Sequence, residues 1–239
     1  MSAIKKVIKR IVFHFIKPPI VYVVNTYSQA GEDSVIKFLF NGKGIDKPSY
    51  LDIGTSNPID DNNTYLFYKK GSKGVCVEAN SVLIDNIKEK RPLDVVLNVG
   101  INVGHEEEAD FYMFEEGALN TFSKEEAEYR EKNGSFKIQG VIKVKLKLIN
   151  DLIRENFDSY PDFLSIDIEG VDLDVLQSLD FNKFPIPVIC VETCTYSENH
   201  IKPKNLLITD FMLSKNYFVY GDTYINTIYV NNNWFYKGQ

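Results

Sequence analysis

The chain has 239 residues, 44% of them hydrophobic and 25% charged, which is enough for one well-buried domain of moderate size. Its 27 basic and 33 acidic residues leave a formal charge of −6, which argues against broad binding to nucleic-acid phosphates. Three cysteines lie in or beside apolar runs without a C-x-x-C pair, which predicts reduced, buried thiols in a cytoplasmic protein: Cys76, Cys190 and Cys194.

The N-terminal residues 1–17 are basic and amphipathic, and no acid precedes Glu32. Apolar residues recur at helical spacing from Ile4 to Phe15, and Pro18-Pro19 stops the helix. The helix is too short and too charged to cross a bilayer and lacks the features of a signal peptide. Two interpretations stay open: docking on an anionic inner-membrane face or a partner protein, and packing on its own domain. We therefore divide the chain into an extension, 1–26, and one domain, 27–239.

The remaining sequence alternates between strands and helices. Strands are expected at 50–54, 74–78, 94–100, 109–114, 141–147, 162–168, 187–193, 217–221 and 226–231. Helices are expected at 30–40, 62–70, 81–90, 122–132, 148–157, 171–179 and 202–215. Short apolar strands are typical of a parallel sheet covered on both faces, and the short link 222–225 predicts a final antiparallel hairpin. The pattern predicts an α/β fold with a mostly parallel sheet and helices on both faces.

The first two predicted strands end in a pattern that suits a nucleoside. Asp52 and Gly54 close the first strand, and Glu78 closes the second. Glycine lets the backbone approach a ligand closely, and an acid at the second strand tip can accept both ribose hydroxyls. Asn57 and Pro58 stand where a dinucleotide motif needs further glycines, which disfavours a nicotinamide oxidoreductase. The alternative is that Gly54 serves only the turn.

A second group of acids ends two later strands. Asp167 and Glu169 lie two residues apart, on one face of the strand end, and Glu192 closes the following strand. If these strands are neighbours, the three carboxylates converge and need a bound cation, a shared proton or a sulfonium beside them. The alternative is that Asp167 or Glu169 caps the next helix.

Two further segments complete the candidate site. Ser28 precedes a predicted helix and could cap it, whereas Gln29 could reach a bound cofactor. Residues 115–140 are polar and rich in turns, and we interpret them as a lid over the site.

An ordered series of motifs covers residues 27–215. They are Ser28-Gln29-x-Gly31-Glu32-Asp33, Leu51-Asp52-Ile53-Gly54, Asn63-Thr64, Val77-Glu78-Ala79-Asn80, Asp167-Ile168-Glu169-Gly170-x-Asp172 and Val191-Glu192. Together they resemble the FkbM family of S-adenosylmethionine-dependent methyltransferases. The resemblance implies a Rossmann-like sheet of seven strands that ends in an antiparallel hairpin. It also implies O-methylation of sugar hydroxyls, as in the capsule or lipopolysaccharide of bacteria.

The resemblance assigns roles to individual residues. A cation, Mg²⁺ or Mn²⁺, would lie between Asp167 and Glu192, although Thr193 follows where related metal-binding enzymes tend to have a second acid. The proton would pass to Asp167, Glu169 or His200. The cofactor would be held by Gln29, Asp52, Gly54, Asn57, Glu78, Ala79, Asn80 and Asp167.

Several questions stay open at this stage. The expected acceptor is a nucleotide-linked sugar or a finished polysaccharide, with a lipid or an amine as the alternative. A non-catalytic glycan-assembly scaffold is the rival outside enzymes, and three converging carboxylates argue against it. The sequence does not determine the oligomeric state, and a dimer is compatible with it.

Overall fold

The computed structural model describes residues 25–104, 106–115, 117–133, 136–168, 170–194 and 204–237. The predicted amphipathic helix, Glu169 and His200 lie outside these ranges. No helix within the described ranges is both long and apolar enough to cross a membrane.

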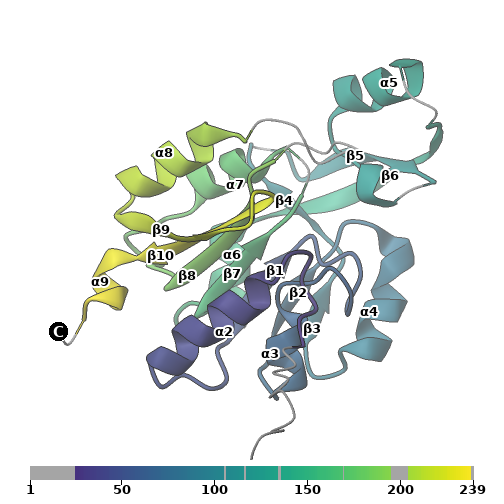
Figure 1. Ribbon diagram of the computed structural model, residues 1–239. Coiled ribbons are helices and arrows are strands. Elements are labelled where there is room, and N and C mark those ends of the chain that lie inside the picture. Colours follow the sequence, from purple (N-terminus) through teal and green to yellow (C-terminus); the bar gives the residue numbers. More distant parts are fainter. Residues whose placement is uncertain are drawn as a thin grey trace, which may run out of the picture.

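The main sheet has seven strands in the order β3-β2-β1-β7-β8-β10-β9 (Figure 1). Its first five strands are parallel to one another. β10 runs antiparallel to both of its neighbours, β8 and β9, and forms with β9 the final hairpin that the sequence predicts. The central strands are buried on both faces, which is why they read as short apolar runs. The strands are β3 (Val95–Leu97), β2 (Gly74–Val77), β1 (Tyr50–Ile53), β7 (Phe163–Ile166), β8 (Val188–Glu192), β10 (Asn226–Asn231) and β9 (Tyr217–Asp222).

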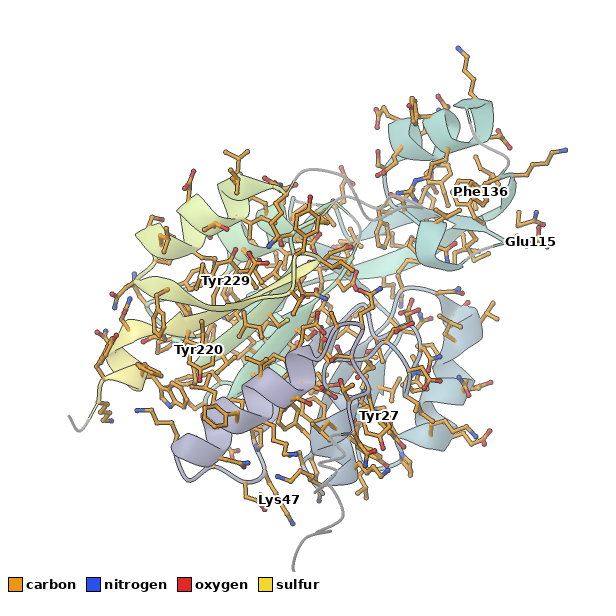
Figure 2. The ribbon with its side chains drawn as sticks, viewed as in Figure 1. Tyr27, Lys47, Glu115, Phe136, Tyr220 and Tyr229 are labelled. Atoms are coloured by element: carbon orange, nitrogen blue, oxygen red, sulfur yellow. The ribbon has the colours of Figure 1, made fainter. Side chains whose placement is uncertain are left out.

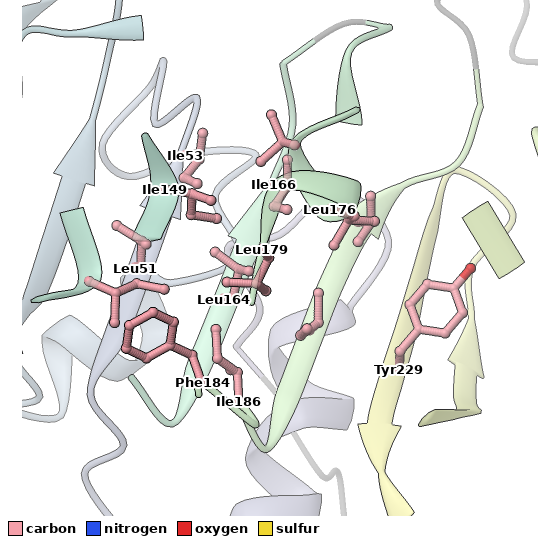
Figure 3. Close-up of a cluster of buried hydrophobic side chains, with 14 of the residues drawn as sticks. Leu51, Ile53, Ile149, Leu164, Ile166, Leu176, Leu179, Phe184, Ile186 and Tyr229 are labelled. Atoms are coloured by element: carbon pink, nitrogen blue, oxygen red, sulfur yellow. The ribbon is translucent and has the colours of Figure 1, made fainter. Parts of the chain in front are cut away.

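Helices cover both faces of this sheet because alternate strand residues point to opposite sides. Leu51 and Leu164 pack toward α6 (Ile149–Asn156), α7 (Asp172–Ser178) and α8 (Leu206–Ser214) (Figure 3). Their neighbours Tyr50 and Phe163 pack with α2 (Glu32–Gly42), α3 (Tyr65–Lys69) and α9 (Asn232–Phe235) on the other face. The η1 turn (Ser81–Leu83) and α4 (Ile84–Lys90) link β2 to β3.

A second, three-stranded sheet is inserted between β3 and α6 and projects beside the main sheet (Figure 1). It consists of β4 (Gly100–Asn102), β6 (Ile138–Leu148) and β5 (Glu108–Phe114), with η2 (Gly117–Leu119) and α5 (Lys124–Asn133). Phe114, Leu119 and Ala127 form a small core of its own, against which Phe136 packs (Figure 2). We call this unit, residues 100–148, the small sheet.

Three element predictions are wrong in detail. The strand expected at 94–100 is two strands, β3 and β4, which belong to different sheets. The helix expected at 62–70 begins at Tyr65, because the Asn62 side chain accepts from the backbone N–H groups of Thr64 and Tyr65 and forms a turn. The last short helix, α9, was not expected at all.

The tips of the central strands align at one edge of the sheet. Ile53 is in register with Val77 on one side and Ile166 on the other. Gly54 follows with φ +82°, and a Cβ added there would lie 1.9 Å from the carbonyl oxygen of Asp167. The edge therefore closes tightly only because residue 54 has no side chain.

We expect Gly54→Ala to lower the free energy of unfolding by about 3 kcal/mol or more, through the clash and the positive φ. Urea unfolding followed by circular dichroism measures this. Gly42→Ala is the matched control, since a Cβ there meets nothing within 4 Å and alanine favours the end of α2. Equal stability of the two variants would contradict the packing argument.

Candidate active site

A cavity of about 310 Å³ lies at the carboxyl edge of the main sheet, where the chain order reverses between β1 and β7. Open α/β sheets bind ligands at such a switch point. The small sheet forms part of its wall through Phe111, Gly117 and residues 120–122. Most of the predicted site residues line it: Gln29, Asp52, Gly54, Asn57, Glu78, Ala79, Asp167 and Glu192.

Glu78 is held rigidly at the tip of β2. Its two carboxylate oxygens accept from the backbone N–H groups of Ser56, at 2.9 Å, and Asn80, at 2.7 Å. Burial raises the pKa of Glu78, and these N–H groups act in the opposite direction. A carboxylate has about four acceptor positions, so both oxygens remain able to accept from ribose hydroxyls.

Asn80 is the one predicted cofactor residue that does not line the cavity. Its side-chain oxygen accepts from the N–H of Val82 and caps the η1 turn. Its contribution to the site is indirect, since its backbone N–H orients Glu78.

Asp52 belongs to a buried ionic network. Its Oδ2 accepts from Asn62 at 3.1 Å and from Thr64 at 2.9 Å, and Arg91 Nη1 lies 3.4 Å away. Burial raises the pKa of Asp52, and the Arg91 guanidinium lowers it again. Asp52 thus reaches the cavity while it also anchors the loop that follows β1.

Arg91 is the centre of that network and is fully buried. Its Nε donates to Asp94 at 2.8 Å, and its Nη2 donates to Thr64 at 2.8 Å. Asp94 also accepts from the hydroxyl of Tyr50. Sequence reasoning missed Arg91, because it follows the lysine-rich end of α4 and resembles a surface residue.

Asp167 and Glu192 form the second acidic part of the site. Their strands, β7 and β8, are adjacent and parallel, which the predicted convergence required. A hydrogen bond joins the two carboxyl groups, and the pKa of Asp167 rises to about 7 through burial and the nearby charge of Asp172, against the effect of that bond. A hydrogen bond between the two carboxyl groups offsets part of their mutual repulsion.

The described residues do not provide a complete metal site. No group of three or more His, Cys, Asp or Glu side chains among them could hold an ion. Asp167 and Glu192 share a hydrogen bond instead, and a cation would require both to be ionised. Glu169 and His200, the other two predicted acid–base candidates, lie outside the described residues.

The start of α2 and the segment before it are held by hydrogen bonds, some of them to the β9–β10 hairpin. Gly31 is the N-cap of α2 and Ser28 Oγ accepts from the N–H of Asp33, so Ser28 fixes the turn without capping the helix. Glu32 accepts from Thr223 and Asn226 in the β9–β10 hairpin. These contacts hold the exposed Gln29 at the cavity.

The small sheet contributes an aromatic and amide wall. Phe122 leans on Gly100, where an added Cβ would lie 2.6 Å from its ring, and its centroid is 4.7 Å from that of Phe111. The side-chain oxygen of Asn120 accepts from the N–H of Phe114, which leaves its two amide hydrogens available. Asn120 and Phe122 belong to the predicted lid, residues 115–140, and Phe111 precedes it; none of the three carried a signal in the sequence.

The remaining lining suits the cofactor expected from the sequence. Leu83, Val99 and Ile101 add apolar surface near Glu78, as a purine ring needs beside a ribose acceptor. Acidic side chains around the cavity favour a sulfonium and an ammonium group. The donor set therefore fits S-adenosylmethionine.

The family comparison agrees with this geometry. Residues 52–219, which include both acidic strand tips, match the model of the methyltransferase FkbM domain. The chain belongs to the FkbM methyltransferase family. The matched region is the methyltransferase domain of that family.

The comparisons with solved structures and with curated proteins say less about this chain than the family model does. An FkbM methyltransferase from Methylobacillus flagellatus KT aligns at 14% identity with a TM-score of 0.46, over 77% of this chain and 44% of that one. The chain thus spans under half the length of that relative. A TehB-like SAM-dependent methyltransferase from Corynebacterium glutamicum ATCC 13032 Kitasato aligns at 7% identity with a TM-score of 0.42, over 96% of both chains. No curated protein matches the chain.

We expect Arg91→Met to lower the free energy of unfolding by about 3–5 kcal/mol, because it leaves the buried Asp52 and Asp94 without their cation. Thermal and urea unfolding measure this. The control is Lys90→Met, whose exposed pair with Glu89 is expected to be worth under about 1 kcal/mol. Similar losses in both variants would contradict the central role of Arg91.

We expect Glu78→Gln to weaken S-adenosylhomocysteine binding at least about tenfold, since hydrogen bonds to a charged acceptor contribute about 1.5–3 kcal/mol. Calorimetry on folded protein measures this, with the exposed Glu89→Gln on α4 as the control. Unchanged affinity in Glu78→Gln would remove Glu78 from the cofactor site.

Proposed function

We propose that this FkbM methyltransferase transfers the methyl group to a sugar hydroxyl during the assembly of a bacterial surface polysaccharide. The observation that carries the proposal is the Asp167–Glu192 pair, which lies in the same cavity as Glu78. A sugar hydroxyl is a weak acid and needs a base beside it, whereas Glu78 and the apolar wall suit the cofactor. The sequence motifs that resemble sugar O-methyltransferases support this acceptor class.

The carboxyl pair performs the proton transfer. S-adenosylmethionine supplies a methyl group on a positively charged sulfur. Asp167, in its ionised form, would accept the proton of the acceptor hydroxyl as that oxygen takes up the methyl group, which would leave S-adenosylhomocysteine. The hydrogen bond between Glu192 and Asp167 holds the Asp167 carboxyl group in position.

The proposal needs no metal. The sequence predicted Mg²⁺ or Mn²⁺ between Asp167 and Glu192. The described residues supply only these two carboxyl groups as ligands, and the two are hydrogen-bonded to each other. A cation held by so few protein ligands would take most of its coordination from water or substrate. We therefore assign the base function to the pair itself.

We expect kcat/KM to rise with pH through about 7 and then level off, because Asp167 must lose its proton and its pKa is about 7. Asp167→Asn should lower the rate about 10²–10⁴-fold, the usual contribution of a general base. The measurement is release of S-adenosylhomocysteine from a panel of sugars and polysaccharide fragments, in EDTA and in Mg²⁺.

The exposed Asp174→Asn, on the first turn of α7, is the control and should keep the wild-type rate. Full activity in folded Asp167→Asn would overturn the assignment of the base. Activity that is lost in EDTA and restored by Mg²⁺ would restore the metal hypothesis.

A further inference from the structure

The charged side chains that line the cavity in the described part of the chain are all acidic. Among the described residues that line it there are carboxylates but no lysine, arginine or histidine. Arg91, the nearest buried cation, is bound to Asp94 and Asp52 and does not reach the lining. The lining acids are Asp52, Asp60, Asp61, Glu78, Asp167 and Glu192.

Two of these acids lie at the exposed rim of the cavity. Asp60 and Asp61 follow the Gly54 turn, and Asp61 has a left-handed φ of +54°. Their carboxylates form no hydrogen bond or ion pair with another residue in the described part of the chain. Their charge therefore acts on whatever enters the cavity.

The described residues that line the cavity offer no basic side chain to a phosphate group. Proteins bind phosphate with arginine, lysine or the free N–H groups of a helix N-terminus. The helix α7 begins beside the cavity with Asp172, whose carboxylate already accepts from the N–H groups of Ile168 and Gly170. The first turn of α2 likewise carries its own acids, Glu32 and Asp33. A diphosphate would enter this field without compensation.

The wall from the small sheet favours an uncharged ligand. Asn120 and Phe122 both line the cavity; the side-chain oxygen of Asn120 accepts from the N–H of Phe114, and the ring of Phe122 packs beside that of Phe111. Amide donors with an aromatic surface suit a molecule with many hydroxyl groups and apolar C–H faces. This observation is independent of the acidic rim.

We propose that the acceptor enters the cavity without phosphate or carboxylate, as a neutral sugar or an amino sugar, and that it is not linked to a nucleotide. This inference rests on the proposed sugar O-methylation. Asp60 and Asp61 select against anionic acceptors by repulsion, and the two positive groups of the cofactor are drawn in by the same field.

The test compares one set of hexoses in three forms: the methyl glycoside, the amino-sugar glycoside and the uridine diphosphate conjugate. We expect kcat/KM for the conjugate to be at least about tenfold below that for the glycoside, a difference of about 1.4 kcal/mol. The difference in kcat/KM between the two forms should become smaller at higher salt, because salt screens the charges of Asp60 and Asp61. A conjugate that reacts faster than its glycoside would overturn the inference.

A charge-matched pair of variants tests the rim. The double variant Asp60→Asn, Asp61→Asn should lower the ratio of kcat/KM for the glycoside to kcat/KM for the conjugate about fivefold or more, because two nearby like charges are removed. The control Asp85→Asn, Glu89→Gln removes the same charge from exposed positions on α4 that do not line the cavity. Equal changes in both double variants would show that the rim has no specific role.

A binding measurement separates this inference from the proposed function. If no sugar in any form is methylated although the protein binds S-adenosylmethionine, sugar transfer fails as the function. Calorimetry of uridine diphosphate with the S-adenosylhomocysteine complex still decides the charge question. A Kd above about 1 mM supports phosphate exclusion, and a tighter Kd overturns it.

Discussion

The buried guanidinium of Arg91 is the interaction on which the site depends. It joins Asp52 at the end of β1, Asp94 before β3 and Thr64 before α3. A buried charge is tolerated only when its partners surround it, so all three segments must take their native positions together. The loop between Gly54 and Thr64, which carries the N–H group that holds Glu78, is thereby fixed at both ends.

The tight contact at Gly54 transmits this order across the sheet. Because the Asp167 carbonyl approaches residue 54 so closely, the tips of β1 and β7 form one continuous edge. Glu78 lies on one side of that edge, and the Asp167–Glu192 pair lies on the other. The proposed cofactor acid and the proposed base therefore follow strands β2 and β7, which flank β1 in the same sheet.

Acidic side chains outnumber basic ones at this edge of the sheet, among the described residues that line the cavity. Burial raises the pKa values of Asp52, Glu78 and Asp167, yet the described lining contributes no basic side chain to offset them. Backbone N–H groups, Arg91 and the hydrogen bond between Asp167 and Glu192 offset the cost of burying these acids. The proposed cofactor binding, proton transfer and acceptor choice all depend on the same excess of carboxylates.

The sequence alone determined the α/β class, the antiparallel end of the sheet and the residues at the strand tips. Apolar runs that end in Asp52, Glu78, Asp167 and Glu192 reveal strands and their carboxyl ends, because burial and alternation are local signals. Only the tertiary structure decided that β7 and β8 are neighbours, that Asp167 and Glu192 are hydrogen-bonded and that Asn80 caps the η1 turn and does not line the cavity. Arg91 and the wall formed by the small sheet were equally out of reach, since their roles arise from contacts between segments distant in the chain, which no local pattern encodes.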